Sequence, residues 1–163
     1  MKQIASILLA TIFFTCHRVP PVKTGLEGKS LPSFDFLLMD STSFNSNNIP
    51  SGKPIVLFYL SPTCPYCRAE IKEIQTNIAS LQNFRIYILT TASISVMKDF
   101  YSKYHLNNYP NINVAIDNSF EFGSYFNIKT VPFNAIYTSQ KKLNSVIPGK
   151  AVAKDFEKLE QLN

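Results

Sequence analysis

The stretch "YLSPTCPYCRAEI" at residues 59–71 places two cysteines, Cys64 and Cys67, two residues apart. It continues "PIVLFYL" (54–60), a nearly unbroken β-branched and aromatic run, which is typical of a central strand covered on both faces. After the cysteines, apolar residues recur at three- and four-residue spacing, which predicts a helix. The pair therefore lies where a central strand passes into a helix.

The predicted helix has an apolar face and a defined start. Pro65 fits the first turn, where a missing N–H costs nothing, and Ser61 or Thr63 is expected as the N-cap. The residues expected on its apolar face are Cys67, Ile71, Ile74, Ile78 and Leu81.

The rest of the chain alternates between strand and helix patterns. Further strands are predicted at 33–40, 43–45, 84–90, 111–117, 133–138 and 143–149. Helices are predicted at 94–106 (with Ile94, Val96, Phe100 and Tyr104 inward), 119–127 and 150–161. The last two strands flank a turn at Lys141-Lys142 and are expected to be antiparallel. This order predicts an α/β sandwich with a mixed sheet, and puts the cysteines at the carboxyl end of a central strand, where active sites collect.

A Cys-x-x-Cys pair at a helix start has a direct chemical consequence. Unsatisfied N–H groups and the helix dipole favour the thiolate of Cys64, which is the form that attacks a disulfide. Cys67 lies one turn further on, within reach to resolve a mixed disulfide. Pro65 stiffens the ring that the two sulfurs close, and Tyr66 lies beside it.

Two other uses of the cysteines are less favoured. A structural zinc site needs four ligands, and beyond this pair the chain offers only Cys16, His17 and His105, without a second pair at ligand spacing. A purely structural disulfide would close too short a loop to stabilise much chain. Redox exchange is therefore favoured, with the Cys64–Cys67 disulfide as the redox group and no metal or other cofactor.

Two further features lie near the cysteines in sequence or by pattern. Glu70 follows Cys67 by one turn, and its spacing favours a solvated carboxylate paired with Lys72 or Arg68 over a proton acceptor near the sulfurs. In "KTVPFNAIY" (129–137) a proline introduces a strand. A cis Val131–Pro132 bond there would bring the Val131 backbone close to another element.

The N-terminus indicates export. Residues 1–16 resemble a secretory signal, and Cys16, directly after the apolar run, suits a lipoprotein signal in which it becomes the lipidated first residue. Residues 17–30 are predicted to be a tether and 31–163 the folded domain. Export means an oxidising compartment, the periplasm or cell envelope, with lipid at Cys16 as a membrane attachment. The net charge of +5 is scattered without a basic stripe, so a nucleic-acid partner is not expected.

Taken together, these motifs resemble the thioredoxin superfamily, and more narrowly its exported TlpA/ResA-like branch of thiol-disulfide proteins. The resemblance covers about residues 31–161: "LPSFDFLLMD" resembles the added N-terminal hairpin, "GKPIVLFYLSPTCPYCRAEI" the strand, active site and helix, and "TVPFNAIY" the cis-proline loop. It implies a thioredoxin-like sandwich with that hairpin.

The resemblance also implies roles for single residues. Cys64 becomes the attacking thiol and Cys67 the resolving thiol. Val131 and Pro132 form the loop that binds substrate backbone, beside Pro65 and Tyr66. Because this branch commonly carries an acid three residues after the second cysteine, the resemblance raises Glu70 to a catalytic candidate.

Some features depart from related families. Phe58 stands where plain thioredoxins keep a buried acid, which leaves their proton route in question. The glycine pair of glutaredoxins and the Pro-x-x-x-Thr-x-x-Cys pattern of peroxiredoxins are both absent.

The sequence thus predicts a thiol-disulfide oxidoreductase that acts on client proteins with disulfides or thiols and exchanges electrons with an envelope redox partner. The alternative is a module of the same fold that binds a peptide, or assists copper or cytochrome assembly, without turnover.

Overall fold

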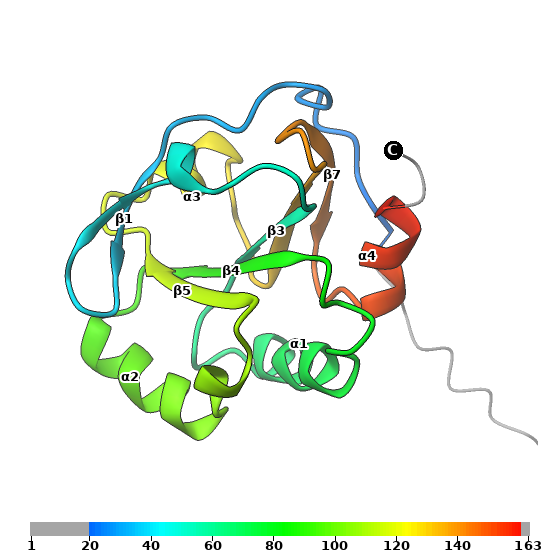
Figure 1. The fold of residues 1–163 in the computed structure, drawn as a ribbon. Helices are drawn as coiled ribbons and strands as arrows, with labels where there is room; N and C mark the ends of the chain where they lie inside the picture. The colour runs from blue at the N-terminus through cyan, green and yellow to red at the C-terminus, as the bar shows by residue number, and fades with distance from the viewer. Residues whose placement is uncertain (1–19, 161–163) are drawn as a thin grey trace, which may run out of the picture.

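The computed structural model describes residues 20–160, which form one mixed sheet with helices on both faces (Figure 1). The elements, in chain order, are β1 (Asp35–Leu38), β2 (Ser43–Asn45), η1 (Ser46–Asn48), β3 (Ile55–Tyr59), α1 (Pro65–Thr76), β4 (Arg85–Thr90), α2 (Ile94–Lys103), η2 (Leu106–Asn108), β5 (Ile112–Ile116), α3 (Glu121–Tyr125), β6 (Phe133–Tyr137), β7 (Leu143–Pro148) and α4 (Ala153–Glu160).

Within the described residues the sheet has seven strands in the order β2-β1-β5-β4-β3-β6-β7. Strands β3, β4 and β5 run parallel, whereas β6 pairs antiparallel with both β3 and β7. At the other edge, β1 pairs antiparallel with β5 and forms a hairpin with β2. Strand β3 is thus internal, and all five of its residues are buried, which explains its unbroken apolar sequence.

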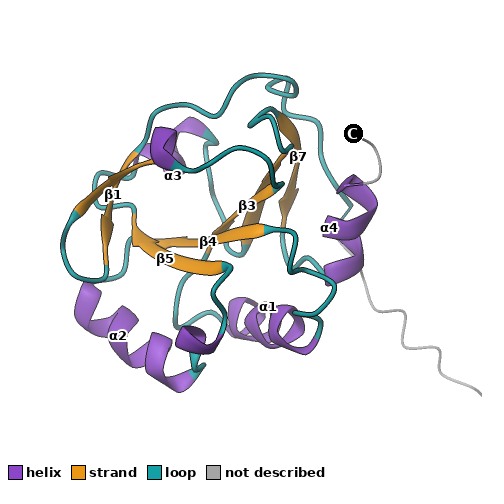
Figure 2. Ribbon diagram, viewed as in Figure 1, coloured by secondary structure: helices purple, strands orange, loops and turns teal. Residues whose placement is uncertain are grey.

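Alternate residues of the strands build two apolar layers. Figure 2 shows the helices that lie on the two sides of the sheet. Val56 and Phe58 of β3 face the layer that includes residues of α1, α2 and α4. Leu57 and Tyr59 face the opposite layer, which contains α3 and the segment before β1. The carboxyl end of β3 is therefore held between two cores, and the loop that follows starts from a fixed point.

The predicted fold class is confirmed, including the N-terminal hairpin and the antiparallel last pair of strands. Helices α1, α2 and α3 are shorter than predicted, and α2 also differs in phase. Helix α1 ends at Thr76, so Ile78 and Leu81, which were expected on its apolar face, follow it, and α3 covers only Glu121–Tyr125 of the predicted 119–127.

Helix α2 ends at Lys103, before η2, and its buried side chain is Met97, whereas Val96 is 46% exposed. Both three- and four-residue steps lead to the buried Phe100, so the pattern did not decide between Val96 and Met97.

The segment predicted as a tether is partly attached to the domain. Val22 forms a bridge with Val146, and Ser30 forms one with Lys142, so residues 22–30 lie along β7. The signal sequence and Cys16 lie outside the described residues. No helix between residues 20 and 160 is long and apolar enough to cross a membrane.

Candidate redox site

Cys64 begins helix α1 at the end of the loop that follows β3. It is the N-cap residue, and its Sγ accepts the N–H of Cys67 at 3.5 Å. Pro65 occupies the first turn, as predicted. The expected caps, Ser61 and Thr63, instead bond to each other through their hydroxyl oxygens at 3.0 Å. The sulfur thus takes the position that a hydroxyl oxygen takes at many helix starts.

The two sulfurs differ in exposure. Cys64 is half-buried, whereas Cys67 has no exposed surface, and the thiols are not joined to each other. Burial raises the pKa of the Cys67 thiol. Cys64 is therefore the sulfur that an incoming molecule meets first, and Cys67 must lose its proton inside the protein before it can react.

The proline loop before β6 lies directly against Cys64. The Val131–Pro132 peptide bond is cis, and the Cys64 Sγ donates to the carbonyl oxygen of Val131 at 3.6 Å. Pro132 is buried and Val131 is half-buried. On the helix side, Pro65 is exposed and Tyr66 is 67% exposed. The two predicted substrate-binding segments therefore flank the more exposed sulfur.

Glu70 is not the solvated carboxylate that its spacing favoured. The side chain has no exposed surface, because it lies on the inner face of α1, one turn after Cys67. Its Oε1 accepts the Asn134 Nδ2 amide at 2.8 Å, and its Oε2 accepts the Ala151 N–H at 3.1 Å. No ion pair with Arg68 or Lys72 is present among the described residues.

Burial has a large effect on the acidity of Glu70. Loss of hydration raises its pKa from 4.5 to about 8, although the hydrogen bonds from Asn134 and Ala151 and the charge of Lys150 act in the opposite direction. The charge of Glu70 is also one of the smaller causes that raise the pKa of Cys67. A carboxyl group that titrates near neutral pH thus lies close to a buried thiol.

Asn134 is a site residue that the sequence interpretation missed. It lies in β6 opposite Phe58, and its Nδ2 also donates to the Gly149 carbonyl at 3.4 Å. Its Oδ1 has no partner among the described residues. An amide inside the apolar run "FNAIY" was the available signal, since a buried amide needs polar partners. It links the strand after the proline loop to Glu70.

The other buried acid of the described residues, Asp117, has a structural role. It accepts the Tyr59 hydroxyl at 3.2 Å and the N–H groups of Glu121 and Gly123 at 2.9 and 3.1 Å, which fixes the start of α3. Between residues 20 and 160 no three His, Cys, Asp or Glu side chains are grouped as metal ligands.

Fold and site together define a thioredoxin-like protein with a paired-cysteine helix start. Sequence comparison agrees: residues 28–145 match the AhpC/TSA family, and the chain belongs to that family.

Single related proteins match only part of the chain. The soluble secreted antigen MPT53 of Mycobacterium tuberculosis is 40% identical over 65 residues, which are 39% of this chain and 37% of that protein. The match thus spans little more than a third of that relative's length.

Among solved structures, two illustrate the likeness. One is a secreted Mycobacterium tuberculosis disulfide oxidoreductase homologous to E. coli DsbE, with 23% identity, a TM-score of 0.62, and coverage of 78% of this chain and 92% of that chain. Another is the peroxidoxin BcpB of the same organism, with 14% identity, a TM-score of 0.69, and coverage of 84% and 97%. At these identities the likeness establishes the fold.

Glu70 should make the stability of the reduced protein depend on pH. The folded state holds the Glu70 proton more tightly than the unfolded chain does. Protonated Glu70 therefore adds to the free energy of unfolding; this addition is fully present below pH 4.5 and is lost as pH rises toward about 8. Between about pH 5 and pH 8, the free energy of unfolding of the wild type, measured in urea, should fall by about 1–4 kcal/mol more than that of Glu70→Gln. A difference between the two proteins that stays constant with pH would contradict the raised pKa.

Proposed function

We propose that this protein is a thiol-disulfide oxidoreductase that exchanges disulfides with client proteins outside the cytoplasm. The observation that carries the proposal is the half-buried Cys64 sulfur, which caps a helix and accepts the N–H of a fully buried Cys67. An accessible sulfur beside a protected one is what a two-step exchange needs. The redox group is the Cys64–Cys67 pair itself.

In the first step the ionised Cys64 sulfur attacks one sulfur of a client disulfide. A bond forms between Cys64 and that client sulfur, the client S–S bond breaks, and the departing client thiolate takes a proton. In the second step Cys67 loses its proton and attacks Cys64. The Cys64–Cys67 disulfide forms, the second client thiol is released, and two electrons have passed to the client. The same steps in reverse would oxidise a client dithiol.

Glu70 is the proposed acceptor of the Cys67 proton. It is buried one turn beyond Cys67 on the same helix, and its raised pKa suits proton uptake near neutral pH. Asn134 is its positioning residue, because the amide fixes one carboxylate oxygen and favours the charged form. With Phe58 in the strand position where plain thioredoxins keep their acid, the helix supplies the acid instead.

Client backbone is proposed to bind along Val131 and Pro132. This loop lies against Cys64, and the exposed Pro65 and Tyr66 border the same sulfur. A segment held there would present its own sulfur to Cys64, which converts the exchange into a reaction between positioned groups.

Export to the cell envelope, with lipid on Cys16, is proposed from the N-terminal sequence. MPT53 and the disulfide oxidoreductase above are both secreted proteins, and this supports an extracytoplasmic location. Mass spectrometry of the mature protein should find a lipid-modified Cys16 at its N-terminus, and an unmodified or later first residue would exclude the anchor.

Replacement of Cys67 should trap the first intermediate. In Cys67→Ser the second step cannot occur. A mixed disulfide with Cys64 should therefore accumulate when the reduced variant is mixed with native insulin, whose disulfides are intact, or with a disulfide-bonded peptide. Non-reducing electrophoresis and mass spectrometry measure the adduct. Cys64→Ser is the matched control and should form none.

The same reagents separate the proposal from a binding module without turnover. Wild type should speed the reduction of insulin by dithiothreitol, and its cysteine pair should have a measurable reduction potential. Absence of both insulin reduction and covalent adducts would refute the proposed exchange.

Loss of the Glu70 carboxylate should slow the second step. Glu70→Gln is expected to reduce the rate of mixed-disulfide resolution about 10²-fold at pH 7, measured by rapid acid quench. Asn134→Ala removes a hydrogen bond to the carboxylate, so the pH midpoint of that step should move upward by roughly one unit. The control Glu73→Gln changes a half-buried carboxylate elsewhere on α1. Equal rates in all variants would remove Glu70 from the mechanism.

A further inference from the structure

A basic groove runs along the outer side of α1, and Pro65, the first residue of that helix, is part of its lining. It has a volume of about 680 Å³ and lies between α1 and the segment that ends α2 and continues into η2. The lining residues from α1 are Pro65, Arg68, Ala69, Lys72 and Gln75, and those from the other wall are Lys103, Tyr104, His105, Asn108 and Tyr109. Pro65 directly follows Cys64 in the chain, so the groove begins one residue after the residue that carries the more exposed sulfur.

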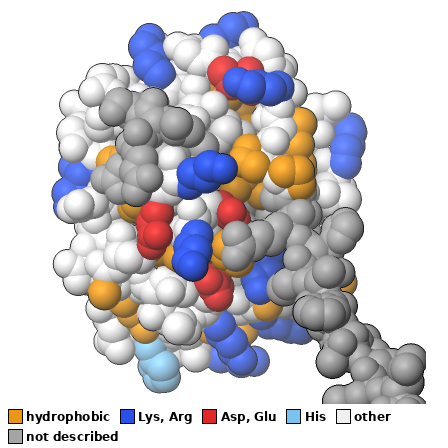
Figure 3. All heavy atoms as spheres, turned by 90° about the vertical axis from the view of Figure 1, so that its right-hand side faces the viewer, with side chains coloured by type: hydrophobic (Ala, Val, Ile, Leu, Met, Phe, Trp, Pro, Cys, Tyr) orange, Lys and Arg blue, Asp and Glu red, His pale blue; other side chains and the backbone are white. Residues whose placement is uncertain are grey.

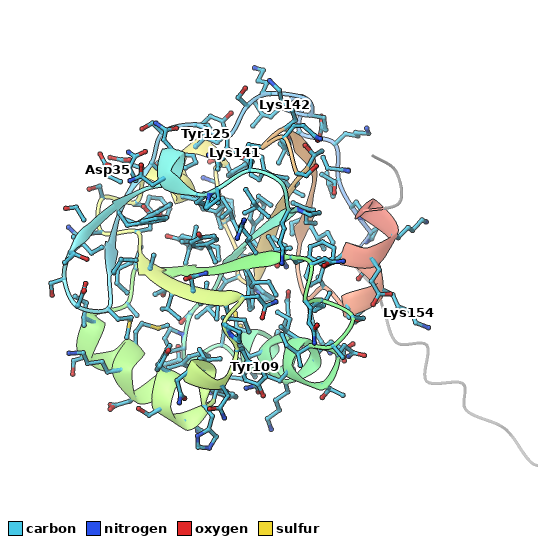
Figure 4. All side chains as sticks on the ribbon, viewed as in Figure 1. Asp35, Tyr109, Tyr125, Lys141, Lys142 and Lys154 are labelled. Atoms are coloured by element: carbon cyan, nitrogen blue, oxygen red, sulfur yellow. The ribbon has the colours of Figure 1, made fainter. Side chains whose placement is uncertain are left out.

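The walls of the groove are fixed to each other and to the core. The Gln75 side-chain amide donates to the Tyr104 carbonyl, which ties α1 to the end of α2. Tyr104 and Leu106 are buried, and His105 between them has a left-handed backbone (φ 47°) and is exposed. Figure 4 shows Tyr109 at the level of α1, close to the turn that follows α2. The groove is therefore a formed feature of the fold.

The charge of the groove has one sign. Its lining includes Arg68, Lys72 and Lys103 and no acidic residue. Within residues 20–160, the side chains of these three cations make no hydrogen bond or ion pair. Figure 3 shows Lys and Arg side chains spread over the face that it draws, some of them in its lower part.

A second groove provides a useful contrast. It lies near the amino ends of β4 and β5 and also contains two cations, Lys53 and Arg85. Both are used by the fold itself, because Lys53 donates to the Gln82 carbonyl at 3.3 Å and Arg85 to the Pro50 carbonyl at 3.1 Å. Among residues 20–160, the cations of the groove along α1 have no such internal partners, so their charge is available to a bound molecule.

We propose that the groove selects clients with an acidic segment next to the reacting cysteine. This inference rests on the proposed disulfide exchange and names its substrate class. A cluster of unpaired cations favours carboxylates on the partner, chiefly through faster encounter and a fixed register. From Pro65 to Gln75, α1 rises about 15 Å, which an extended peptide covers in roughly five residues. The acidic residues should therefore lie within about five positions of the client cysteine.

The test uses disulfide-bonded peptides that differ only in the segment beside one cysteine, with four Glu, four Gln or four Lys. At low salt, kcat/KM of the wild type for reduction should be about tenfold higher for the Glu peptide than for the Gln peptide, and lowest for the Lys peptide. The preference should shrink toward unity in about 0.5 M NaCl, because salt screens exposed charges.

Two double variants locate the effect. Lys72→Gln with Lys103→Gln should reduce the Glu-to-Gln preference to about twofold. Lys154→Gln with Lys158→Gln removes the same charge from exposed positions on α4, and should keep the tenfold preference. Arg68 is left unchanged, because it directly follows Cys67. Circular dichroism checks that both variants are folded.

The outcomes separate this inference from the function on which it rests. If no peptide is reduced, the proposed exchange fails. If the Glu and Gln peptides are reduced equally, or if both double variants lose the preference alike, the groove does not select clients while the exchange stands. Binding to anionic phospholipid vesicles is measured for the same proteins. If the Lys72→Gln, Lys103→Gln variant loses this binding but keeps the peptide preference, the groove binds a membrane and the inference is overturned.

Discussion

The hydrogen bond from the Cys67 N–H to the Cys64 sulfur is the contact on which the site depends. It exists because β3 is buried on both faces and ends at a fixed point, so the following loop delivers Cys64 to the N-cap position of α1. Pro65 suits this start, since it has no N–H that needs a partner. The Cys64 sulfur then lies against the N-terminus of α1 instead of in bulk water. In this way the buried strand β3 fixes the sulfur where helix N–H groups favour its ionised form.

Further along α1 the protein buries the Cys67 thiol and the Glu70 carboxyl, and ionising both of them at once is unfavourable. Cys67 and Glu70 lie one turn apart without exposure, and burial raises the pKa of each. In a medium of low polarity a proton on one of them stabilises the pair, and removal of a proton from Cys67 is easiest when Glu70 can receive it. Asn134 and the Ala151 N–H limit the cost of the buried carboxylate, because they replace part of its lost hydration. The burial that lowers the free energy of unfolding at higher pH is therefore also the basis of the proposed proton transfer from Cys67 to Glu70.

The sequence was sufficient for features that depend on local pattern and insufficient for those that depend on distant partners. The strand 54–60, the helix after Cys64 and the final antiparallel strands follow from periodicity, and the structure has them. The environment of Glu70 does not follow, because Asn134 lies 64 residues away and Ala151 lies 81 away. Spacing along α1 shows which residues share a face, but whether that face is solvated is decided by β6 and the turn before α4. The cap was missed for a different reason: Ser61 and Thr63 have better capping chemistry than a thiol, yet the helix starts too late for either to reach it.

Helix α1 combines three tasks by its periodicity. Its first turn holds the reactive sulfur, its inner face places Cys67 and Glu70 three residues apart in the core, and its outer face carries Arg68 and Lys72 into a groove. Residues three and four apart share a face, so the inner and outer series interleave without interfering. In the proposed mechanism the second step depends on core positions, where substitutions alter packing and proton affinity, whereas the proposed choice of client depends on exposed positions. We expect replacement of an outer cation to leave the hydrogen bonds around Glu70 in place, and for this reason the proposed specificity could change along α1 without loss of the proposed redox reaction.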